Sequence, residues 1–341
     1  MSTKIAINGF GRIGRQAFQI AFERPELEIV AINDLADNKT LAHLLRYDSV
    51  YGLYEKDVKF TEKSLIVEGE EIIASAEKDP EKLPWKDLGI DIVLECTGFF
   101  TEKEGSEKHL RAGAKQVIIS APSKSPDVPT FVLGVNEEKF NPEKDHIISN
   151  TSCTTNAFAP LVKVLNDEFG IVKGLMTTIH SYTSTQNLVD GPPRGKPDLR
   201  RARAAALSFL PTTTGSAKDT VKVIPELEGR LDSIAIRVPS PCVSLVDFTA
   251  HLTKPTSVEE VAEVFKKASQ GDLKGILGIN EEPLVSVDFR KNTYSSIVDL
   301  PYLRVKGENL VKVLSWYDNE WGYASRLVDM AEYVAKQIKS K

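Results

Sequence analysis

The segment Gly9-Phe10-Gly11-Arg12-Ile13-Gly14 constrains the fold of this chain more than any other part of the sequence. It matches the pattern G-x-G-x-x-G. It follows a short apolar run at residues 4–8 and opens a stretch, 13–22, whose apolar residues recur at helical spacing. A strand, a glycine-rich turn and a helix in this order are typical of a dinucleotide-binding unit.

Each glycine of this motif has a separate physical task. Gly9 permits the tight turn, Gly11 lets the backbone approach a pyrophosphate, and Gly14 allows the helix to pack closely on the strand. The free N–H groups and the dipole at the helix start favour an anion. We therefore expect residues 9–14, Phe10, Arg12 and Ile13 included, to contact a bound cofactor.

An acidic residue stands where such a unit binds ribose. A second β-like run, 27–32, is followed by Asn33 and Asp34, about 20 residues past the glycines. Asp34 would accept hydrogen bonds from ribose hydroxyls and repel a 2′-phosphate, so the sequence favours NAD over NADP. The plainer alternative is a tight turn followed by an ordinary exposed aspartate.

Strand-like and helix-like segments alternate over the first 150 residues. We expect helices at 38–47 and 101–112, a hairpin around Glu68-Gly69-Glu70, and strands at 90–94, 117–120 and 131–133. Thr97 and Gly98 follow one of these strands and join the expected cofactor contacts. This alternation predicts an α/β fold with a Rossmann-type, doubly wound parallel sheet.

The pattern changes after Asn150. A helix at 153–169 and a strand at 175–179 precede a long polar segment, 181–203, and long segments of this kind are usually functional or disordered. The remaining elements are expected strands at 243–252 and 311–316 and helices at 258–268 and 324–338. Long strands with few crossovers predict an α+β catalytic domain with a mixed or antiparallel sheet.

The chain length of 341 residues fits two domains. We place an NAD-binding domain at 1–151 and a catalytic domain at 152–317, and we expect a C-terminal helix, about 318–341, to pack back on the first domain.

Composition excludes several classes of function. A net charge of -5 gives no general attraction to nucleic acid or anionic lipid, and no apolar stretch is long enough for a membrane span. The N-terminus reads as a strand, not a signal peptide. The three cysteines, Cys96, Cys153 and Cys242, are far apart and lack metal-ligand spacing, which argues against a disulfide framework and a metal site. We expect a cytoplasmic protein with neither a membrane nor nucleic acid as its primary partner.

Cys153 is the candidate nucleophile. It lies in Ser152-Cys153-Thr154-Thr155-Asn156, directly before helical apolar spacing begins at Phe158. A helix N-terminus stabilises a thiolate and lowers the thiol pKa from about 8.5. The plainer reading, a small buried hydrophobe, suits Cys96 and Cys242 better, because they lie in or beside apolar runs.

His180 is the candidate base among five histidines. It ends an expected strand and opens the long polar segment, a position typical of site residues. The other four histidines lie in or beside helical or strand-like runs and are weaker candidates: His43, His109, His146 and His251.

The chain closely resembles the phosphorylating glyceraldehyde-3-phosphate dehydrogenases of the NAD-dependent, glycolytic type. The resemblance runs nearly end to end. Its motifs are Asn8 to Arg15, Ala121-Pro122-Ser123, Ser149 to Asn156, His180-Ser181-Tyr182-Thr183, Arg200 to Ala205, Pro211 to Gly215, Arg237-Val238-Pro239 and Trp316 to Glu320.

The resemblance implies roles for matching positions. Cys153 would be the nucleophile and His180 its base. Thr183 and Arg237 would bind the phosphate of the substrate. Inorganic phosphate would be bound by Ser152, Thr154, Arg201, Thr214 and Gly215. Arg12, Ile13, Asp34, Lys78 and Ser120 would contact the cofactor, and Asn319 would orient the nicotinamide carboxamide.

The implied reaction is the oxidative phosphorylation of D-glyceraldehyde 3-phosphate to 1,3-bisphosphoglycerate with NAD and inorganic phosphate. The Cys153 thiolate would add to the aldehyde to give a thiohemiacetal, hydride would pass to the nicotinamide, and phosphate would attack the resulting thioester. The family also implies a homotetramer in which the segment 181–203 reaches a neighbouring subunit's cofactor. The stretch Gly191 to Asp198 is longer here than the common family form.

Two other functions stay open at this point. Trp321, where many family members have threonine, also occurs in the related erythrose-4-phosphate dehydrogenases, which use a longer substrate and water as acceptor. The motifs at 180–183 and 212–215 favour the phosphate-dependent triose reaction. A non-catalytic nucleotide- or RNA-binding protein on the same fold would have no need of Cys153 and His180.

Overall fold

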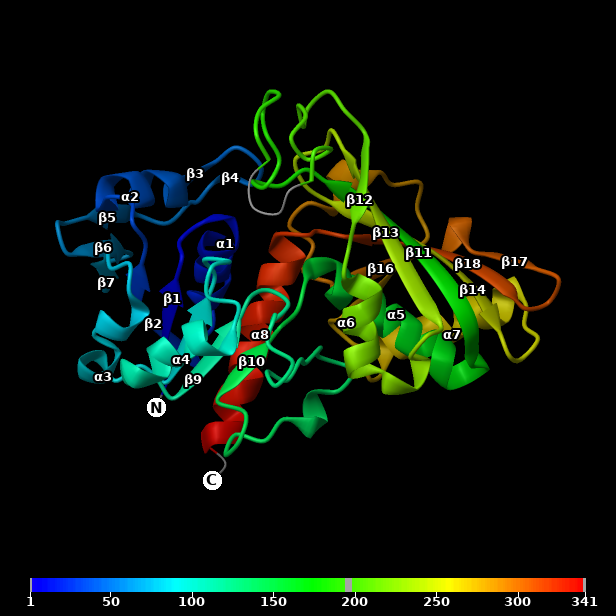
Figure 1. Ribbon diagram of the computed structural model, residues 1–341, viewed down its shortest axis with the longest axis horizontal. Coiled ribbons are helices and arrows are strands. Elements are labelled where there is room, and N and C mark those ends of the chain that lie inside the picture. The colour runs from blue at the N-terminus through cyan, green and yellow to red at the C-terminus, as the bar shows by residue number, and fades with distance from the viewer. Residues whose placement is uncertain (1, 194–197, 340–341) are drawn as a thin grey trace. The chain divides into compact units, whose positions relative to one another are not determined.

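The computed structural model describes residues 2–193 and 198–339. The chain forms two compact units. The first comprises the residues up to Phe131, Glu138–Ser152 and the chain from Ala324 onward; the second comprises Val132–Glu137 and Cys153–Tyr323. Figure 1 shows the elements of both units, and each unit is described separately below.

The first unit is built on an eight-stranded sheet with the order β10-β9-β8-β1-β2-β7-β6-β5. Its strands are β1 (Thr3–Asn8), β2 (Leu27–Asn33), β5 (Val58–Phe60), β6 (Ser64–Val67), β7 (Glu70–Ser75), β8 (Ile92–Glu95), β9 (Gln116–Ile119) and β10 (Ile147–Ser149). The six strands from β10 to β7 pair in parallel. Numbered along the chain, they have the order 3-2-1-4-5-6 of the Rossmann fold, as the sequence predicts.

The expected hairpin adds an antiparallel edge to this sheet. Strands β6 and β7 pair antiparallel through a two-residue turn in which Glu68 and Gly69 both have positive φ, 51° and 86°. Two such residues form the tight turn that matches the twist of paired strands. The sheet is therefore parallel over six strands and antiparallel at this edge only.

The helices of the first unit are α1 (Arg12–Ala21), α2 (Asn38–Arg46), α3 (Trp85–Leu88), α4 (Lys103–Arg111) and most of α8 (Trp321–Lys339). The helix α1 buries Ala17, Phe18 and Ala21 against the sheet. Arg24 and Asp329 form an ion pair that ties the chain after α1 to α8. No helix among the described residues is both long enough and apolar enough to cross a membrane.

One predicted strand of this region is wrong. Residues 131–133 form no strand, although Phe131 and Val132 are apolar and buried. The neighbouring Thr130 makes a single bridge to Ser149, and the chain then turns at Gly134, whose φ is +80°. These buried apolar residues produce the sequence pattern of a strand, but no partner strand forms a continuous hydrogen-bonded ladder with them.

The second unit contains a mixed sheet, as predicted. Its order is β12-β13-β11-β14-β18-β16-β15, with β17 paired to β18. The strands are β11 (Ile171–Ser181), β12 (Leu210–Thr213), β13 (Leu231–Val238), β14 (Ser244–Leu252), β15 (Leu277–Asn280), β16 (Ser296–Asp299), β17 (Arg304–Lys306) and β18 (Leu310–Tyr317). The pairs β11–β13 and β15–β16 are parallel, and the other pairs are antiparallel.

One helix positions the second unit's main chemistry. The helices are α5 (Cys153–Phe169), α6 (Ser216–Val223) and α7 (Val258–Gln270), and Figure 1 shows α5 lying along the long strands. Phe158 of α5 packs edge-on against Phe248 of β14, with ring centroids 4.8 Å apart. Because this core holds α5 on the sheet, the first residue of α5, Cys153, has a fixed place beside the strand ends.

Candidate active site

A pocket of about 500 Å³ opens at the carboxyl ends of the parallel strands in the first unit. It lies where the strand order reverses between β1 and β8, the usual ligand position in a doubly wound sheet. Its lining includes Gly9 and Gly11 after β1, Asp34 after β2, Lys78 after β7 and Thr97 after β8. Five of the residues predicted to contact the cofactor thus surround one cavity.

The surroundings of the motif's glycines differ from one position to the next. Gly9 has φ +93°, and a Cβ there would lie 2.7 Å from the Thr97 nitrogen. A Cβ on Gly14 would lie 2.0 Å from the Gly9 carbonyl oxygen, so α1 can approach β1 only with glycine at this place. A Cβ on Gly11 would meet no atom of the described chain within 4 Å, so the space beside it is open toward a ligand.

Asp34 is tied to the glycine loop. Its Oδ2 accepts a hydrogen bond from the Phe10 N–H (2.8 Å), and its Oδ1 accepts one from the Ala36 N–H (3.1 Å). Arg12, by contrast, forms an ion pair with Asp48 and lies over the Tyr51 ring. Arg12 therefore reaches a cofactor only by giving up or sharing its pairing with Asp48.

The remaining predicted cofactor residues of this unit are close to the end of β8. Thr97 donates from both its N–H and its hydroxyl to the Glu95 carboxylate, and Gly98 follows with φ +72°. The Ser120 N–H donates to the Glu95 carbonyl oxygen (2.9 Å). Ile13, in the first turn of α1, is half-buried. Cys96, which also lines the pocket, has its pKa raised to about 12 by burial.

The second unit presents Cys153 as the first residue of α5. Thr151, two residues earlier, is fully buried with φ 52°, a left-handed conformation that is rare for a β-branched residue. Backbone strain of this kind persists where the surrounding structure enforces it, often at functional sites. Ser152 lies between this turn and Cys153 and is half-buried.

Cys153 and His180 meet as the sequence predicts. The Cys153 Sγ lies 3.5 Å from Nε2 of His180, which is at the end of β11 and only 4% exposed. The Thr154 hydroxyl lies 3.9 Å from the same sulfur. A thiol within hydrogen-bond reach of an imidazole at a helix N-terminus can act as a nucleophile with a base beside it.

The predicted direction of the Cys153 pKa is wrong for this structure. Burial of the sulfur raises the thiol pKa, and this outweighs the opposing effects of the Arg237 charge and the hydrogen bond to Thr154. Burial, followed by the positive charge of Arg237, lowers the pKa of His180 to about 3. Burial therefore favours the neutral form of both groups.

The proton position on His180 depends on its other ring nitrogen. Nδ1 lies 2.8 Å from the Ser181 carbonyl oxygen and 2.8 Å from Arg237 Nη1. If Nδ1–H donates to the carbonyl, Nε2 accepts from the thiol; if Nδ1 accepts from Arg237, Nε2–H donates to a thiolate. The site therefore accommodates either state of the sulfur with a neutral imidazole.

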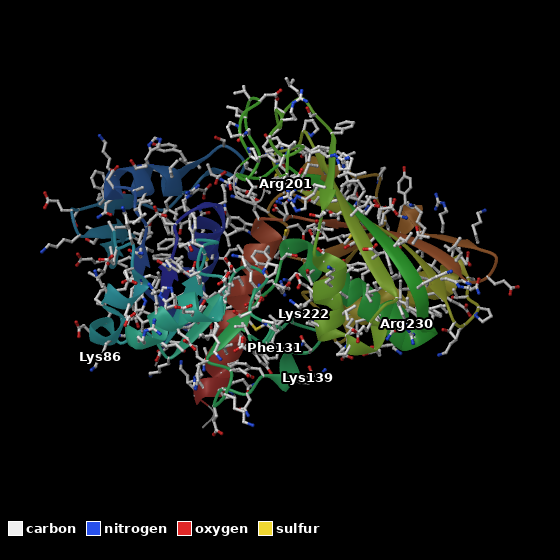
Figure 2. All side chains as sticks on the ribbon, in the orientation of Figure 1. Lys86, Phe131, Lys139, Arg201, Lys222 and Arg230 are labelled. Carbon is white, nitrogen blue, oxygen red and sulfur yellow. The ribbon has the colours of Figure 1, made fainter. Side chains whose placement is uncertain are left out.

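Two arginines give the site its positive charge. Arg237 stands opposite His180 in the parallel register of β13 and β11. Its buried Nε has no hydrogen-bond partner among the described residues. Burial, followed by the charge of Arg201, lowers the Arg237 pKa. Arg201, labelled in Figure 2, donates to the Thr212 hydroxyl (3.0 Å) and the Thr213 carbonyl oxygen (3.2 Å). Two guanidinium groups this close favour anionic ligands.

Other predicted phosphate contacts lie on neighbouring loops. Thr183 shares a hydrogen bond with Thr185 (3.0 Å) in the polar segment after β11. Thr214 bonds to Ser216 (2.8 Å), and Gly215 is the N-cap residue of α6. The first two backbone N–H groups of this helix already donate to side chains, Ser216 N–H to the Thr214 hydroxyl (3.3 Å) and Ala217 N–H to the Ser233 hydroxyl (3.2 Å). The stretch 194–197, part of the longer loop expected at Gly191 to Asp198, lies outside the described residues.

Asn319 is held in one orientation. Its Oδ1 accepts hydrogen bonds from the hydroxyls of Ser181 (2.9 Å) and Ser244 (3.0 Å), and the residue is buried. Because two hydroxyl donors occupy the oxygen, the amide nitrogen remains the group for a ligand. The role of Asn319 as a donor to a carboxamide oxygen stays a prediction.

Several residues near these sites were not predicted. The buried Tyr317 hydroxyl bonds to Thr154 (2.9 Å) and Thr178 (2.8 Å), and its ring lies edge-on to His180. In the first unit, Asn8 and Asn33 bond side chain to side chain beside the pocket. Each of the two asparagines ends an apolar strand, a signal that could have marked them in the sequence.

Comparisons with known proteins agree with the geometry. Residues 3–103 match the family model "Glyceraldehyde 3-phosphate dehydrogenase, NAD binding domain", and residues 152–319 match "Glyceraldehyde 3-phosphate dehydrogenase, C-terminal domain". The glyceraldehyde-3-phosphate dehydrogenase of Geobacillus stearothermophilus is 54% identical over 337 residues, covering 99% of both chains. A relative of that name with the suffix 1 from Bacillus subtilis (strain 168) is 53% identical, again over 99% of both chains. The Streptomyces coelicolor enzyme of the same name is 49% identical over 340 residues, covering 99% of this chain and 100% of its own.

Proposed function

Because the chain belongs to the glyceraldehyde-3-phosphate dehydrogenase family, we propose that it oxidises and phosphorylates D-glyceraldehyde 3-phosphate to 1,3-bisphosphoglycerate through Cys153 and His180. It is an NAD-dependent oxidoreductase. The observation that carries the residue assignment is the 3.5 Å separation of the Cys153 Sγ and the His180 Nε2 at the start of α5.

The first unit fits the cofactor. The open space beside Gly11, which is the N-cap residue of α1, suits a pyrophosphate. Asp34 stands at the pocket rim to accept from ribose hydroxyls, and Lys78 lines the same pocket. Bound NAD supplies the acceptor for the hydride. Asn319, with its oxygen held by two serines, would present its amide nitrogen to the carboxamide.

The protein's own groups account for the covalent steps. The Cys153 sulfur adds to the aldehyde carbon while its proton passes through His180 Nε2 to the former carbonyl oxygen, giving a thiohemiacetal. When the hydride leaves that carbon, Nε2 takes the hydroxyl proton and the thioester forms. This covalent route divides one difficult oxidation into two easier steps. Burial, followed by the charge of Arg237 beside the base, lowers the pKa of His180 and so disfavours a protonated imidazole.

Phosphate attack completes the reaction. An oxygen of inorganic phosphate bonds to the thioester carbon, and the carbon–sulfur bond breaks to release the acyl phosphate and return Cys153. We assign Thr183 and Arg237 to the phosphate of the substrate. Inorganic phosphate is assigned to Ser152, Thr154, Arg201, Thr214 and Gly215. The two arginines support this assignment, because guanidinium groups bind phosphate oxygens.

A phosphate-dependence assay tests the proposed reaction. Steady-state rates are measured with glyceraldehyde 3-phosphate and with erythrose 4-phosphate, each with and without inorganic phosphate, and with NAD and NADP in parallel. We expect turnover of the triose phosphate that requires phosphate and prefers NAD. Phosphate-independent turnover that is faster with the erythrose substrate would replace this proposal with erythrose-4-phosphate dehydrogenase activity.

The protein is proposed to act as a cytoplasmic homotetramer. Several large apolar side chains of the second unit are exposed in the single chain, among them Leu188, Leu199, Leu207 and Phe209, each more than 70% exposed. Clustered apolar residues on one stretch of chain are typical of a subunit interface. Small-molecule substrate and inorganic phosphate are its proposed partners; the net charge of -5 gives no support to a primary role in binding RNA.

A further inference from the structure

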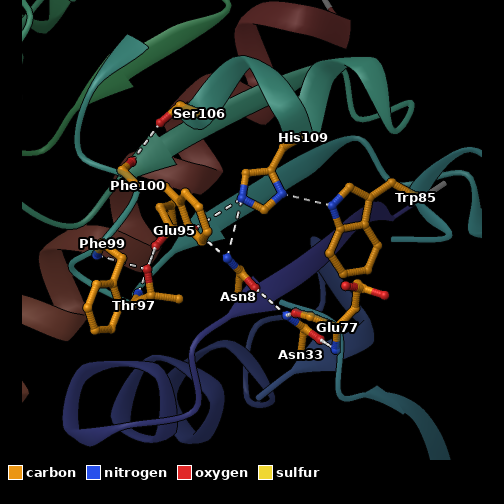
Figure 3. A network of polar contacts seen from close by, with 10 residues as sticks. All are labelled: Asn8, Asn33, Glu77, Trp85, Glu95, Thr97, Phe99, Phe100, Ser106 and His109. Carbon is orange, nitrogen blue, oxygen red and sulfur yellow. Dashed lines mark hydrogen bonds and ion pairs between the residues drawn. The ribbon is translucent and has the colours of Figure 1, made fainter. Parts of the chain in front are cut away.

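A row of buried polar side chains crosses the end of the parallel sheet in the first unit (Figure 3). Asn33, Asn8 and Glu95 are the last residues of the adjacent strands β2, β1 and β8. Asn33 Nδ2 donates to Asn8 Oδ1 (2.7 Å), and Asn8 Nδ2 donates to Glu95 Oε2 (2.5 Å). All three are at most 5% exposed. The row thus spans the point where the strand order reverses.

Two side chains behind the sheet end complete the row. Trp85 Nε1–H donates to His109 Nδ1 (3.0 Å), so Nδ1 carries no proton. The proton of the neutral ring is therefore on Nε2, which donates to Glu95 Oε2 (3.1 Å). Asn8 Nδ2 and His109 Nε2 lie 3.4 Å apart because both donate to the same oxygen of the Glu95 carboxylate. His109 is fully buried.

The Glu95 carboxylate is satisfied on both oxygens. Oε2 accepts from Asn8 and His109, and Oε1 accepts from the N–H and the hydroxyl of Thr97. A buried carboxylate is tolerated only when donors surround it in this way. Four donors on one carboxylate fix its position, and they fix the donors relative to one another.

The three strand-end residues of the row line the pocket or directly precede residues that do. Asn8 precedes Gly9, Asn33 precedes Asp34, and Glu95 holds Thr97, whose nitrogen would lie 2.7 Å from a Cβ on Gly9. Asn33 also exchanges two hydrogen bonds with the backbone of Glu77, beside Lys78. The carboxylate and its donors therefore set the spacing of the loops that surround the cavity.

We propose that Glu95 and His109 are positioning residues for the cofactor: through Asn8, Asn33 and Thr97 they fix the geometry of the pocket and so determine the affinity for NAD. The inference rests on the proposed NAD site. Neither side chain lines the pocket, so both act through the residues they hold.

Substitutions that alter one hydrogen-bonding role at a time test this proposal. Glu95→Gln replaces an acceptor by an amide nitrogen that faces the donors of Asn8 and His109. His109→Leu removes both ring nitrogens at similar volume. His109→Gln keeps one donor for Glu95 and one acceptor for Trp85. Gln116→Leu is the matched control, because Gln116 is equally buried in this unit but lies at the start of β9, the opposite end of the sheet.

NAD affinity of the full-length enzyme is measured by calorimetry. Thermal unfolding and the rate of Cys153 alkylation by iodoacetamide without NAD are measured on the same samples. We expect Glu95→Gln and His109→Leu to weaken NAD binding at least ten-fold and to raise KM for NAD, with kcat at saturating NAD and the alkylation rate within two-fold of wild type. His109→Gln should stay within three-fold of wild-type affinity, and Gln116→Leu should lower the unfolding temperature without changing the affinity.

The opposite pattern overturns the proposal. Unchanged NAD affinity in folded Glu95→Gln would do so, and so would equal losses in His109→Gln and His109→Leu or a matching loss in Gln116→Leu. Should Glu95→Gln not fold, the His109 pair decides the question alone. Failure of the wild-type protein to bind NAD would instead overturn the proposed function, which keeps the two conclusions separate.

Discussion

The protonation of the Cys153–His180 pair is decided by burial more than by the helix that carries the cysteine. The start of α5 favours a thiolate, yet burial raises the thiol pKa and lowers the imidazole pKa to about 3. Arg237 favours the thiolate and disfavours the imidazolium, because its charge lies beside both groups. We therefore expect proton transfer in this site to depend on the arrival of substrate, because a bound substrate changes the burial and the charge around the sulfur.

Replacing the nucleophile should separate chemistry from binding. Cys153→Ser is expected to lower kcat by at least about 10³-fold, because a serine hydroxyl is a much weaker nucleophile than a cysteine sulfur. NAD affinity should stay near that of wild type. Steady-state rates and calorimetry check both expectations, with Cys242→Ala as the control that should retain activity. Near-normal turnover of Cys153→Ser would contradict the nucleophile assignment.

The low pKa of His180 predicts an acid-sensitive fold. Between pH 6.5 and about 3 the unfolded chain protonates this histidine and the folded protein does not. The free energy of unfolding should therefore fall as the pH is lowered, by up to about 1.4 kcal/mol per pH unit for this one group.

Denaturant unfolding of wild type and His180→Asn across pH 4–8 isolates that contribution. The difference between the two proteins should be constant above pH 7 and shift against wild type below pH 6.5. Parallel curves over the whole range would show that His180 is not held neutral.

At the level of secondary structure, two glycines of the β1–α1 turn should respond differently to substitution by alanine. Gly14→Ala forces the new methyl group against the Gly9 carbonyl oxygen, so it should destabilise the fold by about 1–3 kcal/mol and weaken NAD binding. Gly11→Ala enters open space, so it should leave the unfolding temperature unchanged and weaken NAD binding alone. Thermal unfolding and calorimetry of the two variants check this contrast. Equal stability losses would mean that Gly11 also packs against the chain.

The sequence predicts best those elements whose signal is local. The helix α5 begins at Cys153 and ends at Phe169, both as expected, because small polar residues give way there to apolar residues at helical spacing. Strand β11 runs from Ile171 to Ser181, well beyond the expected 175–179, because its ladder with β14 also includes Lys173 and Gly174. A partner strand supplied later in the chain has no local signal.

The pairing of Glu95 with His109 in the polar row of Figure 3 was outside the reach of sequence patterns. His109 lies in the charged helix α4 and was a weak candidate for any role, and Glu95 ends an apolar strand. Apart from Thr97, which follows Glu95 by two residues, their partners are 14 to 101 residues away along the chain. Cys153 and His180 could be predicted because the local sequence places Cys153 at the start of a helix and His180 at the end of a strand. The direction of the thiol pKa could not, since it depends on packing.

For the whole molecule, the exposed apolar residues predict self-association. Light scattering coupled to size exclusion should give four times the chain mass of 37.7 kDa for the wild type. Phe209→Asp and Leu207→Asp, at two of the most exposed apolar positions, should shift the protein to smaller species. Leu53→Asp, an exposed apolar position of the first unit, is the control. A monomeric wild type at micromolar concentration would contradict the proposed tetramer.

The hydrogen bonds of Tyr317 have a consequence for when activity can arise during synthesis. This tyrosine fastens Thr154, in the first turn of α5, to Thr178 of β11, and Asn319 follows it by two residues. When a ribosome has made about 300 residues, it has already synthesised Cys153 and His180. It has not yet synthesised Tyr317 and Asn319, which complete the surroundings of that pair. Nascent chains halted before residue 317 should therefore carry a reactive-site pair without its final packing, and competence should appear only after Tyr317 and Asn319 have left the ribosome.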